Sequence, residues 1–330
     1  MGARRTLAPI AWAAAWAAFG LACGAPSPGA PAPAPSTRPT PAPARSEGPP
    51  AASAAPSASA AGAAGAAPNA AAGEATTPGG GAGGAAERWC APELQTLAGE
   101  ICVFVPSREM AGPRTLVIFL HGIVEPGSAW QWSQQRAASR AAQAQGFAVL
   151  MPRGLRGPGP KGVGRHNVWA WPGSPSAETE AELIASWQRA RAELEARDGR
   201  PFERVWVFGF SSGAYYAASL ALRGRLAGPD APRADGFAAF AGGGGASKAV
   251  ETSARRTKER APIFVGWGGK DPSRNDPSKL AAMLRRLGWP AKGEASPKAG
   301  HEMTDGQVAN AVRFLSAPLP GGAKGRPAKR

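Results

Sequence analysis

Ser211 stands in the pentapeptide Gly209-Phe210-Ser211-Ser212-Gly213, which has the form G-x-S-x-G. A serine hydroxyl is a weak nucleophile until a base takes its proton, and that base must itself be held in position. The pentapeptide directly follows the apolar run Val205–Phe208 and precedes a helical pattern over Ala214–Leu222. In such a strand–turn–helix setting, a tight turn lifts the serine above the edge of a sheet. We therefore predict that Ser211 is a nucleophile; the alternative is one more small residue in a turn.

The sequence offers three histidines as the base. His301 follows Gly300 and precedes a final amphipathic pattern, and we predict that it takes the proton from Ser211. Its alternative is a histidine in a surface loop. His121 comes just after a strand-like run, where a structural role is expected. His166 lies in a loop rich in Gly and Arg, and we expect it to be exposed and inert.

An acid that orients the base is predicted at Asp271. The apolar run Ile263–Trp267 leads into the turn Gly268-Gly269-Lys270-Asp271, and His301 comes 30 residues later. Strand end, acid and then histidine give the chain order Ser…Asp…His. Asp276 is the competing acid, although it could equally cap the helix that follows.

Apolar, β-rich runs alternate with helical patterns from residue 101 onward. Two of the runs are apolar throughout, as expected of strands that are buried on both faces of a parallel sheet. A helical pattern covers Ala177–Ala196 and stops at Asp198-Gly199. The alternation predicts an α/β fold with an open, mostly parallel sheet and helices on both faces. The predicted strands are Ile101–Val105, Leu116–Leu120, Ala148–Met151, Val205–Phe208, Gly236–Ala241 and Ile263–Trp267.

From Ile101 to Ala317 the chain resembles the α/β-hydrolase superfamily. The likeness is greatest to its esterase/polyhydroxyalkanoate-depolymerase and phospholipase/carboxylesterase groups. The pentapeptide around Ser211 resembles their nucleophile elbow, and Gly300-His301 resembles their histidine loop. His121-Gly122-Ile123 resembles the motif whose amide lines the oxyanion hole. The resemblance therefore implies that the amides of Ile123 and Ser212 hold the oxyanion.

Trp169-Ala170-Trp171 resembles a tryptophan pair that several of these esterases carry in a loop over the site. The resemblance implies that Trp169 and Trp171 bind substrate. Trp130 and Trp132 also follow a strand end. Core packing is the alternative for all four, and the sequence leaves the two readings open.

The activity that the residues and the resemblance imply is hydrolysis of carboxylic esters through an acyl-enzyme, without a metal or cofactor. The expected substrate is a small-molecule or polymer ester. One alternative is a surface lipoprotein that uses a hydrolase-like scaffold for binding without catalysis. Another is a peptidase or thioesterase with the same three catalytic residues.

The composition divides the 330 residues, with their 44 Gly and 34 Pro, into unequal parts. Residues 23–86 are almost entirely Ala, Pro, Gly, Ser and Thr, so this segment cannot bury enough apolar surface to fold, and we predict a disordered linker. Residues 87–317 then form one hydrolase domain, and 318–330 form a basic, disordered tail. The net charge of +15 comes with no nucleic-acid-binding motif, so no nucleic-acid partner is expected.

Residues 1–22 are predicted to be a signal peptide, because Arg4 and Arg5 precede an uncharged apolar run that ends at Cys23. The stretch resembles a bacterial lipoprotein signal, which implies lipidation of Cys23. We therefore expect an exported protein, either secreted or held at the cell envelope by a lipid anchor. Cys90 and Cys102 are the remaining cysteines; in an oxidising compartment they are expected to form a disulfide, the alternative being two buried thiols.

Overall fold

The computed structural model describes residues 88–158, 167–173, 175–226 and 233–318. The predicted signal peptide, Cys23, the predicted linker and all but the first residue of the predicted basic tail lie outside the described residues, as does His166. Within the described ranges, no helix is long and apolar enough to cross a membrane.

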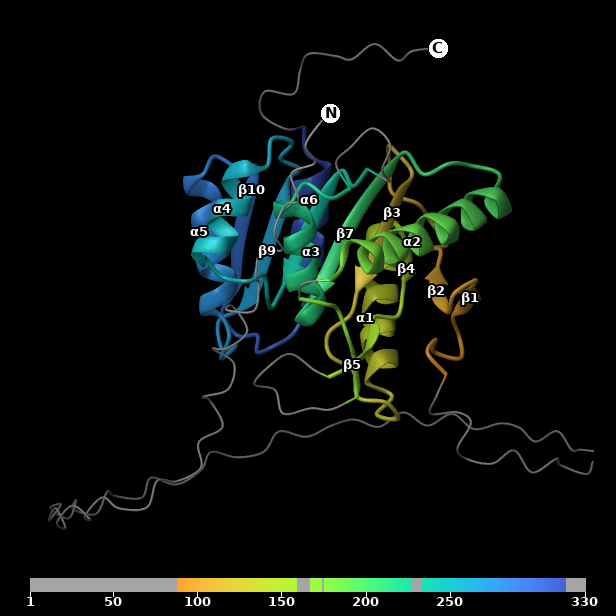
Figure 1. The fold of residues 1–330 in the computed structure, drawn as a ribbon. Helices are drawn as coiled ribbons and strands as arrows, with labels where there is room; N and C mark the ends of the chain where they lie inside the picture. Colours follow the sequence, from red (N-terminus) through yellow and green to blue (C-terminus); the bar gives the residue numbers. More distant parts are fainter. Residues whose placement is uncertain (1–87, 159–166, 174, 227–232, 319–330) are drawn as a thin grey trace, which may run out of the picture. The chain divides into compact units, whose positions relative to one another are not determined.

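An eight-stranded sheet forms the centre of the fold, in the order β1-β2-β4-β3-β7-β8-β9-β10 (Figure 1). Strand β2 pairs antiparallel with both of its neighbours, whereas all pairs from β4 across to β10 are parallel. The strands are β1 (Gln95–Leu97), β2 (Ile101–Phe104), β3 (Thr115–Leu120), β4 (Ala148–Met151), β7 (Arg204–Phe210), β8 (Gly236–Phe240), β9 (Ile263–Gly268) and β10 (Ala291–Ser296). A separate antiparallel pair joins β5 (Leu155–Gly157) to β6 (Val168–Ala170).

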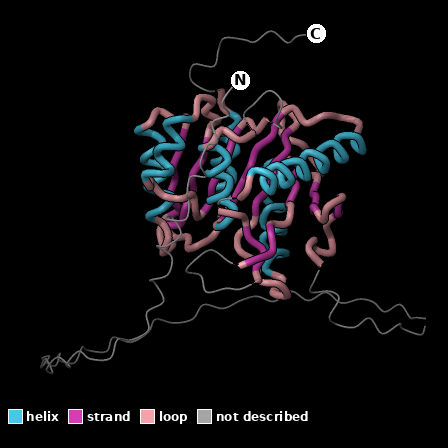
Figure 2. The backbone as a smooth tube through the Cα atoms, in the orientation of Figure 1, coloured by secondary structure: helices cyan, strands magenta, loops and turns pink. Residues whose placement is uncertain are grey.

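Helices cover both faces of the sheet (Figure 2). They are α1 (Trp130–Gln145), α2 (Ala177–Asp198), α3 (Ser212–Leu222), α4 (Lys248–Arg256), α5 (Asn275–Arg286) and α6 (Asp305–Ser316). The predicted fold class is confirmed: the structure is an α/β-hydrolase fold with an open, mostly parallel sheet between two layers of helices.

Two apolar cores lie on the opposite faces of the sheet, and strand β3 contributes alternate residues to each. Leu116, Ile118 and Leu120 pack in the core that α2, α3, α4 and α5 cover. Val117 and Phe119 pack in the core that α1 and α6 cover. Side chains of a strand point alternately to its two faces, so an uninterrupted apolar run is what a strand between two cores requires.

All six predicted strands are present, with ends that differ by at most two residues. Four strands were not predicted: the three-residue strands β1, β5 and β6, and the six-residue strand β10. Strand β10 has the sequence AKGEAS at the sheet edge, and none of its residues is fully buried. It therefore carries no apolar run from which a strand could be inferred.

Capping groups explain where the helices begin and end. The side chain of Ser176 accepts a hydrogen bond from the amide of Thr179 at the start of α2, and Gly199 ends that helix with a positive φ of 66°. At the start of α6, Thr304 and Gln307 form a reciprocal capping box. This box fixes the direction in which the chain enters α6, only three residues after His301.

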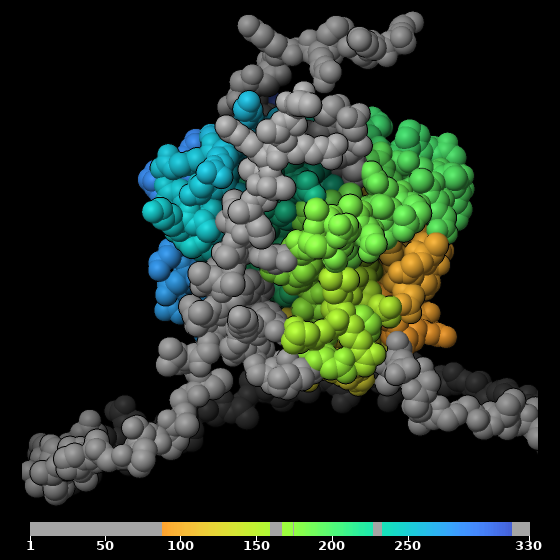
Figure 3. Space-filling model, viewed as in Figure 1, coloured from red at the N-terminus to blue at the C-terminus, as the bar shows by residue number. Residues whose placement is uncertain are grey.

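The segment before β2 is attached to the fold at several points. Cys90 and Cys102 form the predicted disulfide. The side-chain amide of Gln135 accepts from the amide of Ala91 and donates to the carbonyl of Trp89. In Figure 3 the orange surface of this region adjoins the green surface of α2, where Arg197 donates to the side chain of Gln95.

Candidate active site

Ser211 lies in the sharp turn between β7 and α3. Its backbone has φ of 51° and ψ of −115°, a conformation that non-glycine residues rarely adopt. The amide of Ser211 donates to the carbonyl of Phe240 at 2.9 Å, which holds the turn against the end of β8. The turn directs the Ser211 hydroxyl away from the sheet, at the N-terminus of α3, where the helix dipole favours negative charge.

The glycines at both ends of the pentapeptide are required by the crowded backbone. A Cβ atom on Gly209 would lie 2.2 Å from the carbonyl oxygen of Gly213. A Cβ atom on Gly213 would lie 2.0 Å from the carbonyl oxygen of Leu120, at the end of β3. Any other residue at either position would push the turn away from the sheet.

The structure brings Ser211, His301 and Asp271 together, although 90 residues separate the first two. Nε2 of His301 lies 2.9 Å from Oγ of Ser211, and Nδ1 lies 2.9 Å from Oδ2 of Asp271. Because a carboxylate only accepts hydrogen bonds, Nδ1 of His301 carries the proton and donates to Asp271. Nε2 of the neutral ring is then free to accept the hydroxyl proton of Ser211.

Asp271 is fully buried, and both of its carboxylate oxygens are hydrogen-bonded. Oδ1 accepts from the amide of Ser273 at 2.8 Å and from its hydroxyl at 2.7 Å, while Oδ2 faces His301. Burial by itself raises the pKa of Asp271, but the hydrogen bonds from His301 and Ser273 outweigh it and hold the pKa below its usual value. Asp271 is therefore an anion that orients the imidazole.

Asp276, the competing acid, has a different partner. It lies in the first turn of α5 and accepts a hydrogen bond from the hydroxyl of Tyr215 at 2.8 Å. It is not the N-cap residue of that helix, a position that Arg274 occupies. Of the two acids, the structure places only Asp271 in contact with His301.

The backbone after β3 forms a loop beside the Ser211 turn. The amide of Gly213 donates to the carbonyl of His121 at 3.0 Å, and Val124 pairs with Trp169 on β6 through two backbone hydrogen bonds. Within the described part of the chain, the amides of Ile123 and Ser212 have no hydrogen-bond partner. Two unpaired donors next to the nucleophile are what an oxyanion hole requires.

His121 is buried and supports this loop. Its Nδ1 donates to the carbonyl of Gly122, and its Nε2 accepts from the amide of Gly154 at 2.9 Å. Burial lowers the pKa of His121 to about 4, so the ring is neutral at pH 7. The ring also packs against Trp89 and Trp171, with centroids 4.8 and 5.2 Å away.

The two tryptophans predicted to bind substrate lie elsewhere than in the pocket beside His301. Trp171 is only 3% exposed; it stacks on Tyr216, and its indole donates to the carbonyl of His121 at 3.0 Å. For Trp171 the structure therefore favours the core-packing alternative. Trp169 lines a different hollow, together with Arg153, whose guanidinium lies 4.2 Å from the Trp169 ring centroid.

A pocket of about 390 Å³ opens beside His301. Phe119 and Phe210 are buried in its wall, and the ring of Phe210 lies 5.4 Å from that of His301. Trp130, which the sequence left between core packing and pocket lining, is 48% exposed and lines this pocket. Trp132 instead donates through its indole nitrogen to the carbonyl of Arg88.

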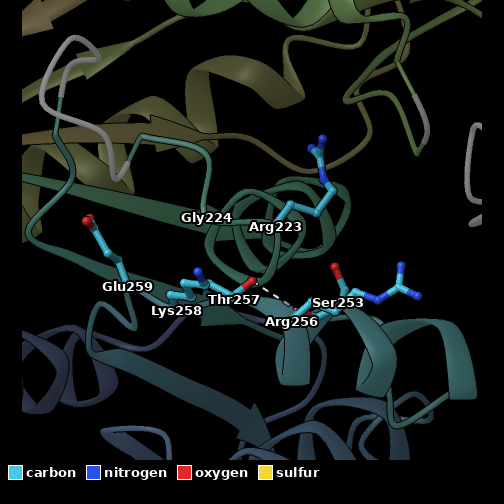
Figure 4. Close-up of a pocket in the computed structure, with 7 residues that line it drawn as sticks. All are labelled: Arg223, Gly224, Ser253, Arg256, Thr257, Lys258 and Glu259. Carbon is cyan, nitrogen blue, oxygen red and sulfur yellow. Dashed lines mark hydrogen bonds between the residues drawn. The ribbon is translucent and has the colours of Figure 1, made fainter. Parts of the chain in front are cut away.

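A second hollow, also of about 390 Å³, lies at the other end of α3 (Figure 4). Arg223 and Gly224 border it, directly after the last residue of α3. Helix α3 has 11 residues, so its two ends are about 16 Å apart. Arg223 donates through Nη1 to the carboxylate of the buried Glu180 at 3.0 Å, and Arg225 donates to the same carboxylate. This hollow is distant from Ser211 and takes no part in its chemistry.

Ser273 and Gln134 are residues of the candidate site that sequence reasoning missed. Ser273 had a local signal, because Asp-x-Ser is a sequence in which the aspartate accepts hydrogen bonds two residues onward. Gln134 accepts from the amide of Gly122 at 2.6 Å, and no sequence pattern indicates that contact. Among the described residues, no group of three or more His, Cys, Asp or Glu side chains could hold a metal ion.

No family model matches the sequence, and no protein with curated annotation matches it. Similar solved structures include SOBER1 of Arabidopsis thaliana, with 19% identity over 61% of this chain and 97% of that one and a TM-score of 0.43. Esterase PE8 is 18% identical over 67% of this chain and 98% of its own, with a TM-score of 0.42. Acyl-protein thioesterase 2 of Zea mays is 17% identical over 66% of this chain and 97% of its own, with a TM-score of 0.43. These likenesses concern the fold, whereas the chemistry of the site depends on its own geometry.

Proposed function

We propose that this protein is a serine hydrolase that cleaves carboxylic esters through an acyl-enzyme. The observation that carries the proposal is the hydrogen-bonded series from Ser211 through His301 to Asp271. Serines in tight turns are common. Here, however, the serine hydroxyl contacts an imidazole, and a buried carboxylate orients that imidazole. This arrangement activates a serine as a nucleophile.

In the first half of the reaction, Oγ of Ser211 attacks the ester carbonyl while Nε2 of His301 takes the hydroxyl proton. Asp271 stabilises the imidazolium that forms. The amides of Ile123 and Ser212 stabilise the oxyanion. The bond from carbon to the alcohol oxygen then breaks, and His301 returns its proton to the departing alcohol. The acyl group is left on Ser211.

In the second half, a water molecule gives a proton to His301 and attacks the acyl carbon. The bond to Oγ of Ser211 breaks, the carboxylic acid leaves, and the proton returns to Ser211. His301 is 36% exposed, so water can reach its ring.

The Ser211→Ala variant tests the mechanism. We expect hydrolysis of p-nitrophenyl butanoate to fall by roughly 10⁶-fold, as when the nucleophile of a triad is removed. Ser278→Ala is the matched control, because Ser278 lies on α5 and its half-buried side chain donates to the carbonyl of Asn275, a residue of the same helix. Equal activity of wild type and Ser211→Ala would contradict the mechanism.

A fluorophosphonate probe separates this proposal from a binding protein with a hydrolase-like scaffold. We expect the intact mass to rise by one adduct in wild type and in Ser278→Ala, but not in Ser211→Ala. A folded wild-type protein that stays unlabelled would support binding without catalysis. Comparing matched oxygen esters, thioesters and amides of butanoic acid then decides among esterase, thioesterase and peptidase.

We further propose that the protein is exported and carries a lipid on Cys23. The apolar run before Cys23 supports export, and so does the Cys90–Cys102 disulfide, because disulfides persist in oxidising compartments. Metabolic labelling with an alkyne fatty acid should mark the wild type but not Cys23→Ser, whereas Cys90→Ser should still be labelled. Equal labelling of wild type and Cys23→Ser would contradict the lipid site.

A further inference from the structure

The pocket beside His301 runs along one face of α1. Trp130, Gln134, Ala137 and Arg140 recur at helical spacing along its wall, and Met303 and Glu302 line it next to His301. From Trp130 to Arg140 the helix rises by about 15 Å. The pocket thus extends along α1, with His301 in its lining, and we refer to it as the channel.

The side of the site on which this channel lies decides which part of an ester would enter it. In the mechanism proposed above, His301 returns its proton to the alcohol oxygen, so the departing alcohol must lie on the His301 side of the acyl carbon. The channel contains His301 and the two residues after it. It therefore accepts the alcohol portion of the ester.

Gln134, which lines the channel, carries a polar group without a partner among the described residues. Gln134 is only 5% exposed, and its Oε1 accepts from the amide of Gly122 at 2.6 Å. An amide N–H can only donate, so this contact fixes which end of the Gln134 side chain is oxygen. Nε2 of Gln134 is buried and has no hydrogen-bond partner among the described residues.

An unpaired buried donor destabilises the folded protein, and nearly all such groups in native proteins are satisfied. The Gly122 contact explains the oxygen of Gln134 but not its NH₂ group. A ligand that brings an acceptor oxygen into the channel would supply the missing partner. Phe119 and Phe210, buried in the same wall, offer only apolar contact.

We propose, on the basis of the function proposed above, that Nε2 of Gln134 donates a hydrogen bond to a second oxygen in the alcohol portion of the substrate. The substrate class is then esters of oxygen-bearing alcohols, such as alkoxy alcohols and polyols, in preference to esters of plain alkanols. Gln134 has two separate tasks: its oxygen holds the loop at Gly122, and its NH₂ group binds the departing alcohol.

The test compares butanoate esters that differ by one atom. The alcohols are heptan-1-ol and its three ether isosteres, 2-butoxyethanol, 3-propoxypropan-1-ol and 4-ethoxybutan-1-ol. All four esters give the same butanoyl-enzyme, so differences in kcat/KM report the step in which the alcohol is still bound. Titration of released butanoic acid measures the rates, and p-nitrophenyl butanoate reports the activity that does not depend on an ether oxygen.

For the wild type, we expect at least one ether ester to exceed the heptyl ester in kcat/KM by roughly three- to tenfold, the range for one hydrogen bond. Gln134→Met should abolish this preference, even if the loss of the Gly122 contact lowers activity on every ester. Gln134→Glu, assayed at pH 8, keeps an oxygen for Gly122 but its carboxylate has no donor. This variant should lose the preference for ether esters, and its activity on p-nitrophenyl butanoate should fall less than that of Gln134→Met.

Gln143→Met is the matched control, because Gln143 lies on α1 but its side chain bonds to Ser107 outside the channel. It should keep the wild-type preference. An absent preference in the wild type, or one that survives in Gln134→Met, would overturn the inference while leaving the hydrolase intact. Failure to hydrolyse any of these esters, with no effect of Ser211→Ala, would instead contradict the proposed function.

Discussion

The amide of Gly213 donates to the carbonyl of His121 at 3.0 Å, so the first turn of α3 is joined directly to the loop after β3. Ser212 directly precedes Gly213, Ile123 lies two residues after His121, and the amides of Ser212 and Ile123 are the proposed oxyanion donors. This one backbone hydrogen bond therefore fixes the position of the Ser212 amide, which follows β7, relative to the Ile123 amide, which follows β3. The turn can approach so closely because residue 213 has no side chain.

Gly213→Ala should separate these two segments. The added Cβ would lie 2.0 Å from the carbonyl oxygen of Leu120, and backbone cannot move aside as a flexible side chain can. We expect a loss of stability of about 2 to 3 kcal/mol, typical of overpacking, and a fall in kcat of at least tenfold. Urea unfolding and p-nitrophenyl butanoate kinetics measure the two effects. Gly306→Ala is the control, since a Cβ there meets nothing within 4 Å; equal behaviour of the two variants would refute the steric argument.

Asp271→Asn should leave the fold intact and remove most of the activity. An asparagine cannot hold the imidazole in the tautomer that accepts from Ser211, and a change of this kind in a triad lowers kcat by about 10⁴-fold. The comparison is with Asp276→Asn, which we expect to keep kcat within a few-fold while weakening the contact to Tyr215. If Asp276→Asn proved the more damaging change, Asp276 would be the orienting acid.

The buried His121 should make stability depend on pH. Its pKa falls from 6.5 to about 4 on folding, so the unfolded chain binds more protons between these two values. Stability is therefore complete above pH 6.5 and is lost as the pH falls toward 4, by about 3 kcal/mol in total. Urea unfolding at a series of pH values would measure it. In His121→Asn, the unfolding free energy should change less steeply with pH between pH 4 and 6.5. An unchanged slope would show that other groups cause the pH dependence.

Removing the Cys90–Cys102 disulfide should cost stability. The bond closes a loop with a sequence separation of 12 residues, for which the chain-entropy model gives about 3 kcal/mol. We expect the Cys90→Ser, Cys102→Ser double variant to unfold at lower urea than the wild type. A reductant should shift the wild type to the same midpoint and leave the double variant unchanged. Coincident midpoints for all samples without reductant would mean that the bond does not form.

The fold was predictable because its central strands have a simple sequence pattern. Strands such as β3 and β7 are buried on both faces, so they appear as unbroken apolar runs, and tight turns follow them. Ser211 and Asp271 each follow such a strand end, so their chain positions indicated the edge at which they meet. Strand β10 had no comparable signal, since its sequence AKGEAS contains no apolar run.

Contacts within the site were predictable only where a local motif carried them. The sequence favoured Asp271 as the acid but left Asp276 as an alternative, because both follow the same strand and only the path of the loop decides which one meets His301. It could not distinguish Gln134 from Gln131 and Gln135 on the same helix, since their partners lie in distant segments. The burial of Trp171 likewise depends on Tyr216 and His121, which approach it from other elements.

Because Ser211 has a positive φ, the side chain that the proposed catalysis requires also lowers the stability of the folded protein. A side chain there disfavours the backbone conformation by about 1 to 2 kcal/mol, yet without the side chain there is no nucleophile. Replacement by glycine relieves this strain, whereas replacement by alanine keeps it. Both variants should be inactive. The glycine variant should unfold at a higher urea concentration than the alanine variant, despite the greater freedom of its unfolded chain. Selection for durability alone would thus remove the very group on which turnover depends.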